Sequence, residues 1–318
     1  MKIKNTTCYG AGLIGTGWAT NFLQKGLKVV MYDISDDLFA QAEERIRHNL
    51  DFLAEEGIYT KAEVDGFMAN YSATSDPAAA LKDADFIQEN GPENLELKQQ
   101  IIETIETYAK PDAVIASSTS GLNISDIAAK AKHPERIVGG HPYNPVFLIP
   151  LVELTAGPKT DPAVLDAAVE FYRFVQKEPV VLKKEAPGFI SNRLQAAVIR
   201  EAADLVDRGV CTVEEVDKAL LFGPGLRYGL LGQVTISNLA GGTHGISGAM
   251  QHMGTTMTKW YEDMATWTSF PETWLATVQQ GVDEAIANRP PSQGNTVEGV
   301  MRFRDKGLVM LLKYHEKL

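Results

Sequence analysis

Apolar and polar positions alternate along the first 185 or so residues in two recurring patterns. Short apolar runs typical of buried strands lie at 28–33, 85–90, 113–118, 136–141 and 179–184. Longer segments with apolar residues at helical spacing lie at 36–57, 94–109 and 161–175. Strands that alternate with amphipathic helices predict a doubly wound α/β fold, in which helices cover both faces of a mostly parallel sheet.

The pattern changes near Pro187, after which strand signals fade and helical periodicity dominates. Two segments in this part begin with a polar residue and carry an acid three positions later: Thr212 with Glu215, and Asn295 with Glu298. Such pairs are typical of helix N-termini with reciprocal caps. The sequence therefore predicts an α/β domain over 1–186, followed by an all-helical domain over 187–318.

A glycine-rich segment follows the first short strand and precedes a helical segment. Gly10, Gly12 and Gly15 stand in G-x-G-x-x-G spacing, and Asp33 ends the next strand 18 residues after Gly15. The glycines permit a tight turn, a close approach to a pyrophosphate and close helix packing, while an acid at position 33 would bind a ribose hydroxyl. A Rossmann-type dinucleotide site is the prediction, and a plain strand-to-helix turn is the alternative.

The choice of dinucleotide follows from the residues after Asp33. They are Ile34 and Ser35, so no arginine is placed to bind the 2′-phosphate of NADP, and the Asp33 carboxylate would repel it. The sequence therefore predicts NAD as the cofactor. Leu13 and Ile14, within the same loop, are expected to contact it together with the glycines.

His141 and Glu153 stand at the two ends of an otherwise apolar segment, GGHPYNPVFLIPLVEL over 139–154. Because a buried unpaired charge is costly, the simplest expectation is that the two side chains meet on neighbouring strands. A histidine can remove a proton as hydride leaves carbon, and a carboxylate on its other ring nitrogen fixes the tautomer. The pair therefore predicts a dehydrogenase base and its orienting acid. A purely structural His–Glu pair is the alternative.

The charge balance argues against two classes of partner. The chain has 30 Lys+Arg against 41 Asp+Glu, a formal net charge of -11. Nucleic acids and anionic membranes both require a positive face, so neither is expected as a partner. No secretory signal and no apolar run of about 18 residues is present, which predicts a soluble protein. Cys8 and Cys211 lie in unlike settings, which argues against a disulfide framework and favours the reducing cytoplasm.

Metal chemistry is not expected. The remaining histidines show no ligand spacing typical of zinc or iron sites; they are His48, His133, His244, His252 and His315.

Five segments, GAGLIGTGW, GPENLELK, SSTSGL, HPYNPVFLIPLVEL and PGFISNRL, occur in this order. Together they resemble the 3-hydroxyacyl-CoA dehydrogenase superfamily over about residues 6–240. The resemblance implies that His141 and Glu153 are the catalytic pair. It also implies that Ser120 contacts substrate and nicotinamide, and that Asn192 binds the substrate near its reacting oxygen.

Further expectations come from the same resemblance. It implies cofactor contacts at Glu93, Lys98 and Asn144, and a homodimer formed through the helical domain. Independently of it, the Ser120 hydroxyl and the Asn192 amide can each donate a hydrogen bond to a substrate oxygen. A turn serine, a surface amide and, for Lys98, a solvated helix residue are the alternatives.

Small 3-hydroxy acids are the expected substrates. In the CoA enzymes of this superfamily, positive charge comes from the helical segment after the second strand; here that segment has only Arg45 and Arg47 among many acids, which argues against CoA. Trp18, GLRYGLLG (225–232) and LAGGTHGISGAMQHMG (239–254) resemble the branch that acts on L-carnitine and L-gulonate, with L-carnitine favoured. L-gulonate, 3-hydroxybutyryl-CoA and a cofactor-binding protein without catalysis are the alternatives.

Carnitine combines a trimethylammonium group with a carboxylate. Aromatic faces can bind such a cation, although plain core packing is the alternative. The aromatic candidates are Tyr143, Phe147, Trp260, Tyr261 and Trp267. Arg193 or Arg227 would bind the substrate carboxylate, unless either serves an ion pair between the domains.

Overall fold

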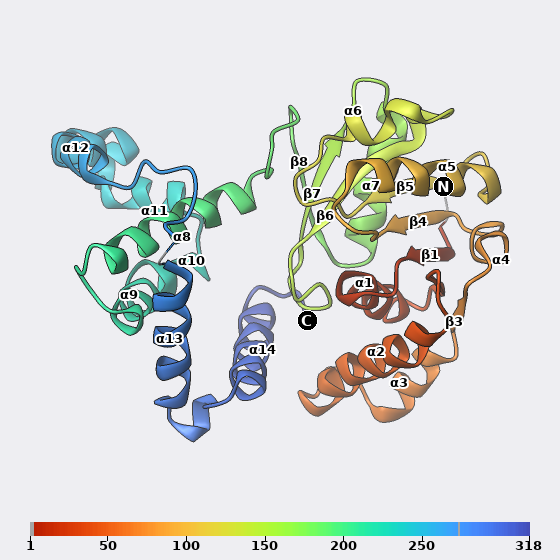
Figure 1. The fold of residues 1–318 in the computed structure, drawn as a ribbon, viewed down its shortest axis with the longest axis horizontal. Coiled ribbons are helices and arrows are strands. Elements are labelled where there is room, and N and C mark those ends of the chain that lie inside the picture. Colours follow the sequence, from red (N-terminus) through yellow and green to blue (C-terminus); the bar gives the residue numbers. More distant parts are fainter. Residues whose placement is uncertain (1–2, 273) are drawn as a thin grey trace. The chain divides into compact units, whose positions relative to one another are not determined.

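The computed structural model describes residues 3–272 and 274–318, and the chain divides into two compact units (Figure 1). Unit 1 comprises the chain up to Asn192 together with Leu308–Leu318, and unit 2 comprises Arg193–Gly307. The end of the chain therefore belongs to the α/β unit, although its sequence pattern is purely helical. The functional division at residue 186 stays a prediction.

One sheet forms the centre of unit 1. In the described part of the chain its strands are β1 (Asn5–Tyr9), β2 (Lys28–Tyr32), β3 (Tyr71–Thr74), β4 (Phe86–Glu89), β5 (Val114–Ser117), β6 (Ile137–Pro142), β7 (Leu151–Ala156) and β8 (Glu178–Val181). Their order is β3-β2-β1-β4-β5-β6-β7-β8, and every neighbouring pair is parallel except β6 with β7. This arrangement confirms the predicted Rossmann-type sheet.

Helices connect these strands. They are α1 (Leu13–Leu23), α2 (Asp37–Glu55), α3 (Lys61–Met68), α4 (Pro77–Leu81), α5 (Leu95–Tyr108), α6 (Ile124–Ile127) and α7 (Pro162–Phe174). Polar side chains cap several starts: Asn94 accepts a hydrogen bond from Leu97 N at 3.0 Å, and Asp161 accepts one from Ala163 N at 2.9 Å. These caps satisfy backbone N–H groups that have no partner within the helix.

Both faces of the sheet are covered, and side chains alternate between two apolar clusters. On β4, Phe86 packs with residues of α1, α2 and α7, whereas the next residue, Ile87, packs with residues of α4, α5 and α6. Val114 and Ile115 of β5 alternate in the same way. This period of two is what a strand buried on both faces requires.

Helix α8 (Ser191–Asp207) begins in unit 1 and continues into unit 2. The other long helices are α9 (Val213–Leu220), α11 (Gln233–Ala240), α12 (Gly245–Asp263), α13 (Trp274–Ala287) and α14 (Val297–Tyr314), and a short one is α10 (Leu226–Tyr228). The predicted capping box of Thr212 and Glu215 is present at the start of α9. The prediction for Asn295 is wrong by one residue, because Thr296 Oγ1 accepts the hydrogen bond from Gly299 N, at 3.1 Å.

The end of α14 explains why unit 1 includes the last residues of the chain. Val309 and Leu312 are buried in a small apolar cluster with Phe52, Leu53 and Leu148. These tertiary contacts account for the placement of the last residues, and the sequence pattern does not show them. Among residues 3–272 and 274–318, no helix combines the length and apolar character that crossing a membrane requires.

Candidate active site

His141 and Glu153 face each other across two antiparallel strands. The register of β6 and β7 places them directly opposite, and His141 Nδ1 lies 2.9 Å from Glu153 Oε2. Both side chains are buried, with 7% and 1% of their surface exposed. Because Nδ1 is engaged by the carboxylate, Nε2 is the ring nitrogen left for a ligand.

The Glu153 carboxylate is held by more than the histidine. Its Oε1 accepts hydrogen bonds from the backbone N–H groups of Ile190 (2.8 Å) and Ser191 (2.9 Å), and its Oε2 accepts one from Ser191 Oγ (2.6 Å). Burial would raise the pKa of this carboxyl, but the hydrogen bonds from His141, Ser191 and Ile190 outweigh it and bring the pKa down to about 2. The carboxylate is therefore ionised at neutral pH.

A cavity of about 290 Å³ opens beside His141. Its lining residues are Ile14, Asn90, Gly91, Glu93, Ser118, Ser120, His141 and Pro142. They come from the glycine loop, from the segments that follow β4 and β5, and from the end of β6. These are the carboxyl ends of neighbouring parallel strands, where open α/β sheets bind their ligands.

The glycine loop has the geometry that a dinucleotide requires. Gly10 has φ +113°, and a Cβ there would lie 2.9 Å from Asn90 O. A Cβ on Gly15 would lie 1.9 Å from Gly10 O, whereas a Cβ on Gly12 would meet no atom within 4 Å. The loop is therefore tightly packed at Gly10 and Gly15, whereas space is open at Gly12, next to the start of α1. A pyrophosphate needs such a space beside a helix N-terminus.

Asp33 follows β2 and lies against the same loop. Its Oδ2 accepts a hydrogen bond from Ala11 N at 2.7 Å, and its Oδ1 accepts one from Ile34 N at 2.8 Å. Within the glycine loop, Leu13 is 60% exposed and Ile14 lines the cavity. These positions fit an NAD molecule whose ribose hydroxyls meet a carboxylate.

Glu93 organises the loop that carries Ser120. Its Oε1 accepts hydrogen bonds from the backbone N–H groups of Ser120 and Gly121, both at 3.0 Å, and from Thr119 Oγ1 at 2.7 Å. Asn192 Nδ2 donates to Ser120 O at 3.0 Å. The structure therefore brings Glu93, Ser120 and Asn192 together.

Lys98 lies deeper than a direct ligand contact would require. Its side chain is 1% exposed, and its Nζ donates to both oxygens of Glu89, at 2.9 and 3.0 Å, and to Gly91 O at 3.0 Å. Glu89 also accepts hydrogen bonds from Ser117 Oγ and Gly91 N. Through Gly91, this buried ion pair fixes the segment that follows β4. A direct contact between Lys98 and NAD stays a prediction.

The predicted substrate residues lie in different surroundings. The ring of Tyr143 is 6.4 Å from that of His141 between centroids, whereas Phe147 packs edge-on against Phe52, at 6.2 Å, beside the cluster that holds α14. Asn144 is exposed between them. Arg193 is the first residue of unit 2.

Several residues of the site were not predicted. Phe189 lies 5.3 Å from His141 between ring centroids, Ser191 binds Glu153, and Asn90 and Ser118 line the cavity. Ser118 and Ser191 both stand in quoted motifs, one or two residues from a predicted position. The place of the two serines within these motifs is the sequence signal that could have identified them.

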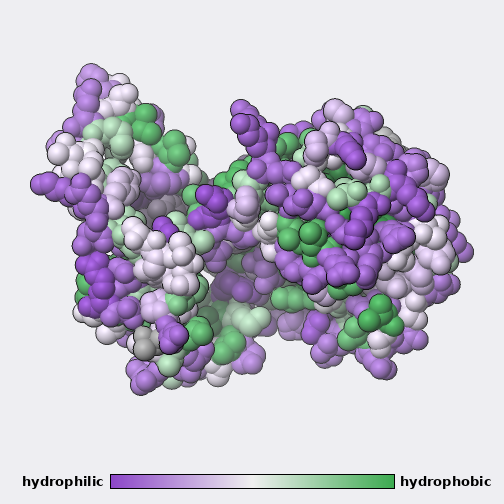
Figure 2. Space-filling view, turned by 45° about the horizontal axis from the view of Figure 1, so that its top comes forward, coloured by the Kyte–Doolittle hydropathy of each residue, from purple (hydrophilic) through white to green (hydrophobic). Residues whose placement is uncertain are grey.

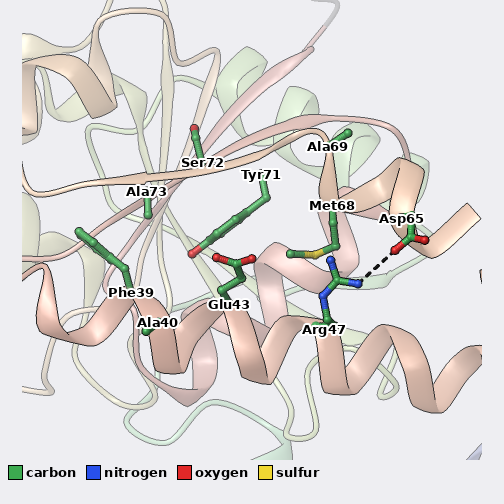
Figure 3. Close-up of a pocket in the computed structure, with 10 residues that line it drawn as sticks. All are labelled: Phe39, Ala40, Glu43, Arg47, Asp65, Met68, Ala69, Tyr71, Ser72 and Ala73. Atoms are coloured by element: carbon green, nitrogen blue, oxygen red, sulfur yellow. Dashed lines mark hydrogen bonds and ion pairs between the residues drawn. The ribbon is translucent and has the colours of Figure 1, made fainter.

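A larger hollow lies away from this site. It measures about 680 Å³ and lies between α2, α3 and the edge strand β3; Tyr71 points between Phe39 and Glu43, and Arg47 pairs with Asp65 (Figure 3). Five strand steps separate β3 from β6, roughly 24 Å. In the described residues, no cluster of His, Cys, Asp and Glu side chains is arranged to hold a metal ion.

Comparisons with known proteins give consistent matches. Residues 5–186 match the family model for the NAD binding domain of 3-hydroxyacyl-CoA dehydrogenase, and residues 188–276 match the model for its C-terminal domain. A curated 3-hydroxyacyl-CoA dehydrogenase of Gibberella moniliformis is 37% identical over 322 residues, covering 100% of this chain and 97% of that protein. A curated L-carnitine dehydrogenase of Burkholderia mallei is 38% identical over 306 residues, covering 96% and 92%.

Among several solved structures that match almost the whole chain is a dehydrogenase. It is a 5-formyl-3-hydroxy-2-methylpyridine 4-carboxylic acid 5-dehydrogenase, described as an NAD+-dependent dismutase. The TM-score is 0.80 and the identity 28%, and the match covers 99% of this chain and 98% of that one.

Proposed function

Because this chain belongs to the 3-hydroxyacyl-CoA dehydrogenase family and NAD is its cofactor, we propose that it oxidises the 3-hydroxyl of L-carnitine to 3-dehydrocarnitine. The observation that carries the proposal is the His141–Glu153 pair beside the cavity. An ionised carboxylate on Nδ1 leaves Nε2 as the proton acceptor and stabilises the imidazolium that forms.

Each residue has one role in the proposed reaction. Bound NAD, held by the glycine loop and Asp33, would supply the hydride acceptor for the carbinol carbon. His141 takes the hydroxyl proton, so that the C–O bond becomes a carbonyl. In the proposed complex the Ser120 hydroxyl and the Asn192 side-chain amide donate to the reacting oxygen. In the structure Ser120 Oγ donates to Glu93 Oε1 at 3.3 Å, and Asn192 Nδ2 donates to the Ser120 carbonyl at 3.0 Å, which keeps the two residues together.

Cofactor binding is assigned to the elements around the glycine loop. We assign Gly10, Gly12, Leu13, Ile14 and Gly15 to the pyrophosphate side. Asp33 takes the ribose hydroxyls. Glu93 acts by fixing the Ser120 loop, and Lys98 by supporting the segment that follows β4 through its ion pair with Glu89. Asn144, exposed after β6, is the remaining contact.

The preference for a small acid over a CoA ester is supported by charge. In the helix after β2, Arg47 is paired with Asp65 at 3.1 Å, and acids are more numerous than bases in this segment. A CoA site needs cations for its phosphates. The matched L-carnitine dehydrogenases point the same way, whereas the matched 3-hydroxyacyl-CoA dehydrogenase keeps the CoA ester as the second candidate.

A homodimer through unit 2 is part of the proposal. The apolar residues buried within unit 2 are small in number and size: Ala203, Val213, Ile236, Ala249 and Ala265, among its described residues. Large apolar side chains such as Phe222, Val234 and Leu239 are more than 60% exposed, and apolar residues reach the surface in Figure 2. Large apolar side chains that are exposed in this way are typical of surfaces that a partner covers.

A three-substrate assay tests the function. Purified protein with NAD is given L-carnitine, L-gulonate or 3-hydroxybutyryl-CoA, and NADH formation is followed by its absorbance. We expect the highest kcat/KM with L-carnitine. Turnover of another substrate alone would replace the substrate and keep the mechanism. NAD binding without turnover of any of the three would contradict the proposed reaction.

A further inference from the structure

Lys177 is a lysine that the proposed reaction does not use, and it is buried. It stands between the end of α7 and the start of β8, directly after Gln176, whose φ is +61°. Its exposed fraction is 3%, and among the residues that the structure describes no carboxylate pairs with it. A buried cation without a counter-charge is costly, so its place requires a specific reason.

The ammonium group binds a single turn of backbone. Lys177 Nζ donates to Val146 O and, at 2.9 Å, to Ile149 O. These carbonyls belong to the turn that begins at Pro145, where Leu148 N and Ile149 N both donate to Pro145 O, at 3.0 and 2.8 Å. The turn connects the strand of His141 to the strand of Glu153 and directly follows Asn144.

The same ammonium lies over the ring of Trp18, 5.3 Å from its centroid. Trp18 is on α1, three residues after the last glycine of the glycine loop, and its Nε1 donates to Ser118 Oγ at 3.2 Å. Its neighbour Gly17 touches the turn: a Cβ on Gly17 would lie 2.7 Å from Val146 Cβ. The turn therefore lies directly on the cofactor helix, and Lys177 contacts both.

We propose that Lys177 is a positioning residue for the cofactor: its ammonium holds the Pro145–Ile149 turn against helix α1 and so fixes the position of Asn144, the residue that precedes the turn. The two carbonyl oxygens and the indole face together take up its N–H groups. Burial lowers the pKa of this lysine to about 7. The role rests on the proposed function in one respect, that Asn144 contacts NAD.

The test compares two lysines at the same corner of unit 1. Lys177→Met keeps the length of the side chain and removes the cation. We expect NADH to bind about tenfold more weakly, which corresponds to ~1.4 kcal/mol, as measured by NADH fluorescence at a temperature where circular dichroism shows folded protein. Lys25→Met is the matched control, because Lys25 Nζ donates to Gln176 Oε1 but does not contact the turn. We expect the control to bind NADH like the wild type.

A merely structural lysine would lower the melting temperature and leave the NADH affinity of the folded protein unchanged. That result with Lys177→Met would overturn the proposal. If Lys177→Met does not fold, Gly17→Ala moves the turn from the other side while Lys177 is intact. Weaker NADH binding by folded Gly17→Ala supports the proposal, and wild-type affinity contradicts it.

These measurements need no substrate. The NADH affinity of Lys177→Met can therefore be interpreted even if none of the three substrates turns over. Conversely, unchanged NADH affinity in Lys177→Met would not affect the substrate assignment. Where a substrate turns over, the KM for NAD should rise in Lys177→Met while the KM for the hydroxy acid stays within about twofold.

Discussion

The two units bury different kinds of side chain. In the described residues, the buried charged groups all lie in unit 1. Lys98 binds Glu89, His141 binds Glu153, and both Lys177 and Arg136 bind backbone carbonyls. Large apolar clusters surround these groups on both faces of the sheet. Unit 2 buries a few small or medium apolar residues and leaves large ones exposed.

The difference in buried side chains suggests different roles: unit 1 carries the reactive groups, and unit 2 carries the proposed dimer surface. Reactive groups need fixed geometry and a low dielectric, and a sheet covered on both faces supplies both. Among its described residues unit 2 has no comparable core, so we expect its stability to depend more on the proposed partner surface. We therefore expect substitutions in unit 1 to change catalysis and intrinsic stability, and substitutions on the apolar faces of unit 2 to change assembly.

The largest expected effect tests the chemistry of unit 1. His141→Ala should lower kcat by at least about 100-fold, because it removes the group that takes the hydroxyl proton, while NADH affinity stays within about twofold. The measurements are NADH formation and NADH fluorescence titration. His133→Ala is a matched control, because His133 forms a surface pair with Glu135 at 3.0 Å. Equal activity of the two variants would exclude His141 as the base.

The second effect tests whether the end of α14 stabilises unit 1. Leu312 is 7% exposed in the cluster with Phe52 and Leu148, whereas its neighbour Leu311 is 37% exposed. Leu312→Ala should reduce the free energy of unfolding by about 2–5 kcal/mol, and Leu311→Ala by less than about 0.5 kcal/mol. Urea unfolding monitored by circular dichroism measures both. Equal losses would show that the buried cluster does not account for the stability.

Much of unit 1 could be predicted from the sequence because its periodic signals are strong. The helix predicted over 94–109 is α5, Leu95–Tyr108, and the strand predicted over 28–33 is β2, Lys28–Tyr32. The edge strand β3, Tyr71–Thr74, was missed because its half-exposed residues carry no continuous apolar run. The expected meeting of His141 with Glu153 is present because strand register brings the ends of one apolar segment together.

Details that depend on tertiary contacts could not be predicted. The burial of Lys98 depends on Glu89, which lies at the end of another element and carries no sequence mark of its role. Phe147 packs on Phe52, far away in the chain, although its sequence neighbours are site residues. The cap of α14 is Thr296 and not the predicted Asn295. Both residue types are good caps, and the spacing to Glu298 alone favoured the wrong one.

The third effect tests assembly through unit 2. Phe222→Asp places a charge on a side chain that is 68% exposed in unit 2, and Phe174→Asp does the same at a side chain that is 56% exposed in unit 1. If apolar faces of unit 2 form the dimer, only Phe222→Asp should weaken it, by about tenfold or more in dissociation constant. Light scattering coupled to size exclusion measures both. A wild-type monomer would contradict the proposed dimer directly.

The smallest expected effect is the pH dependence of the oxidation rate, which tests the His141–Glu153 pair of unit 1. The rate of oxidation should be higher in mildly alkaline than in mildly acidic solution, because the reaction needs a base that is free to accept the hydroxyl proton. Glu153 should not contribute to this rise, because its pKa is about 2 in the folded protein. A lowered carboxyl pKa stabilises the fold above the unfolded value of about 4.3, and this stabilisation is lost only as the pH falls toward 2. Acid unfolding should therefore be separated from the activity profile by more than one pH unit. A flat rate between pH 6 and 8 with a primary deuterium isotope effect on hydride transfer would contradict a histidine base, since chemistry would then limit the rate without a titrating proton acceptor.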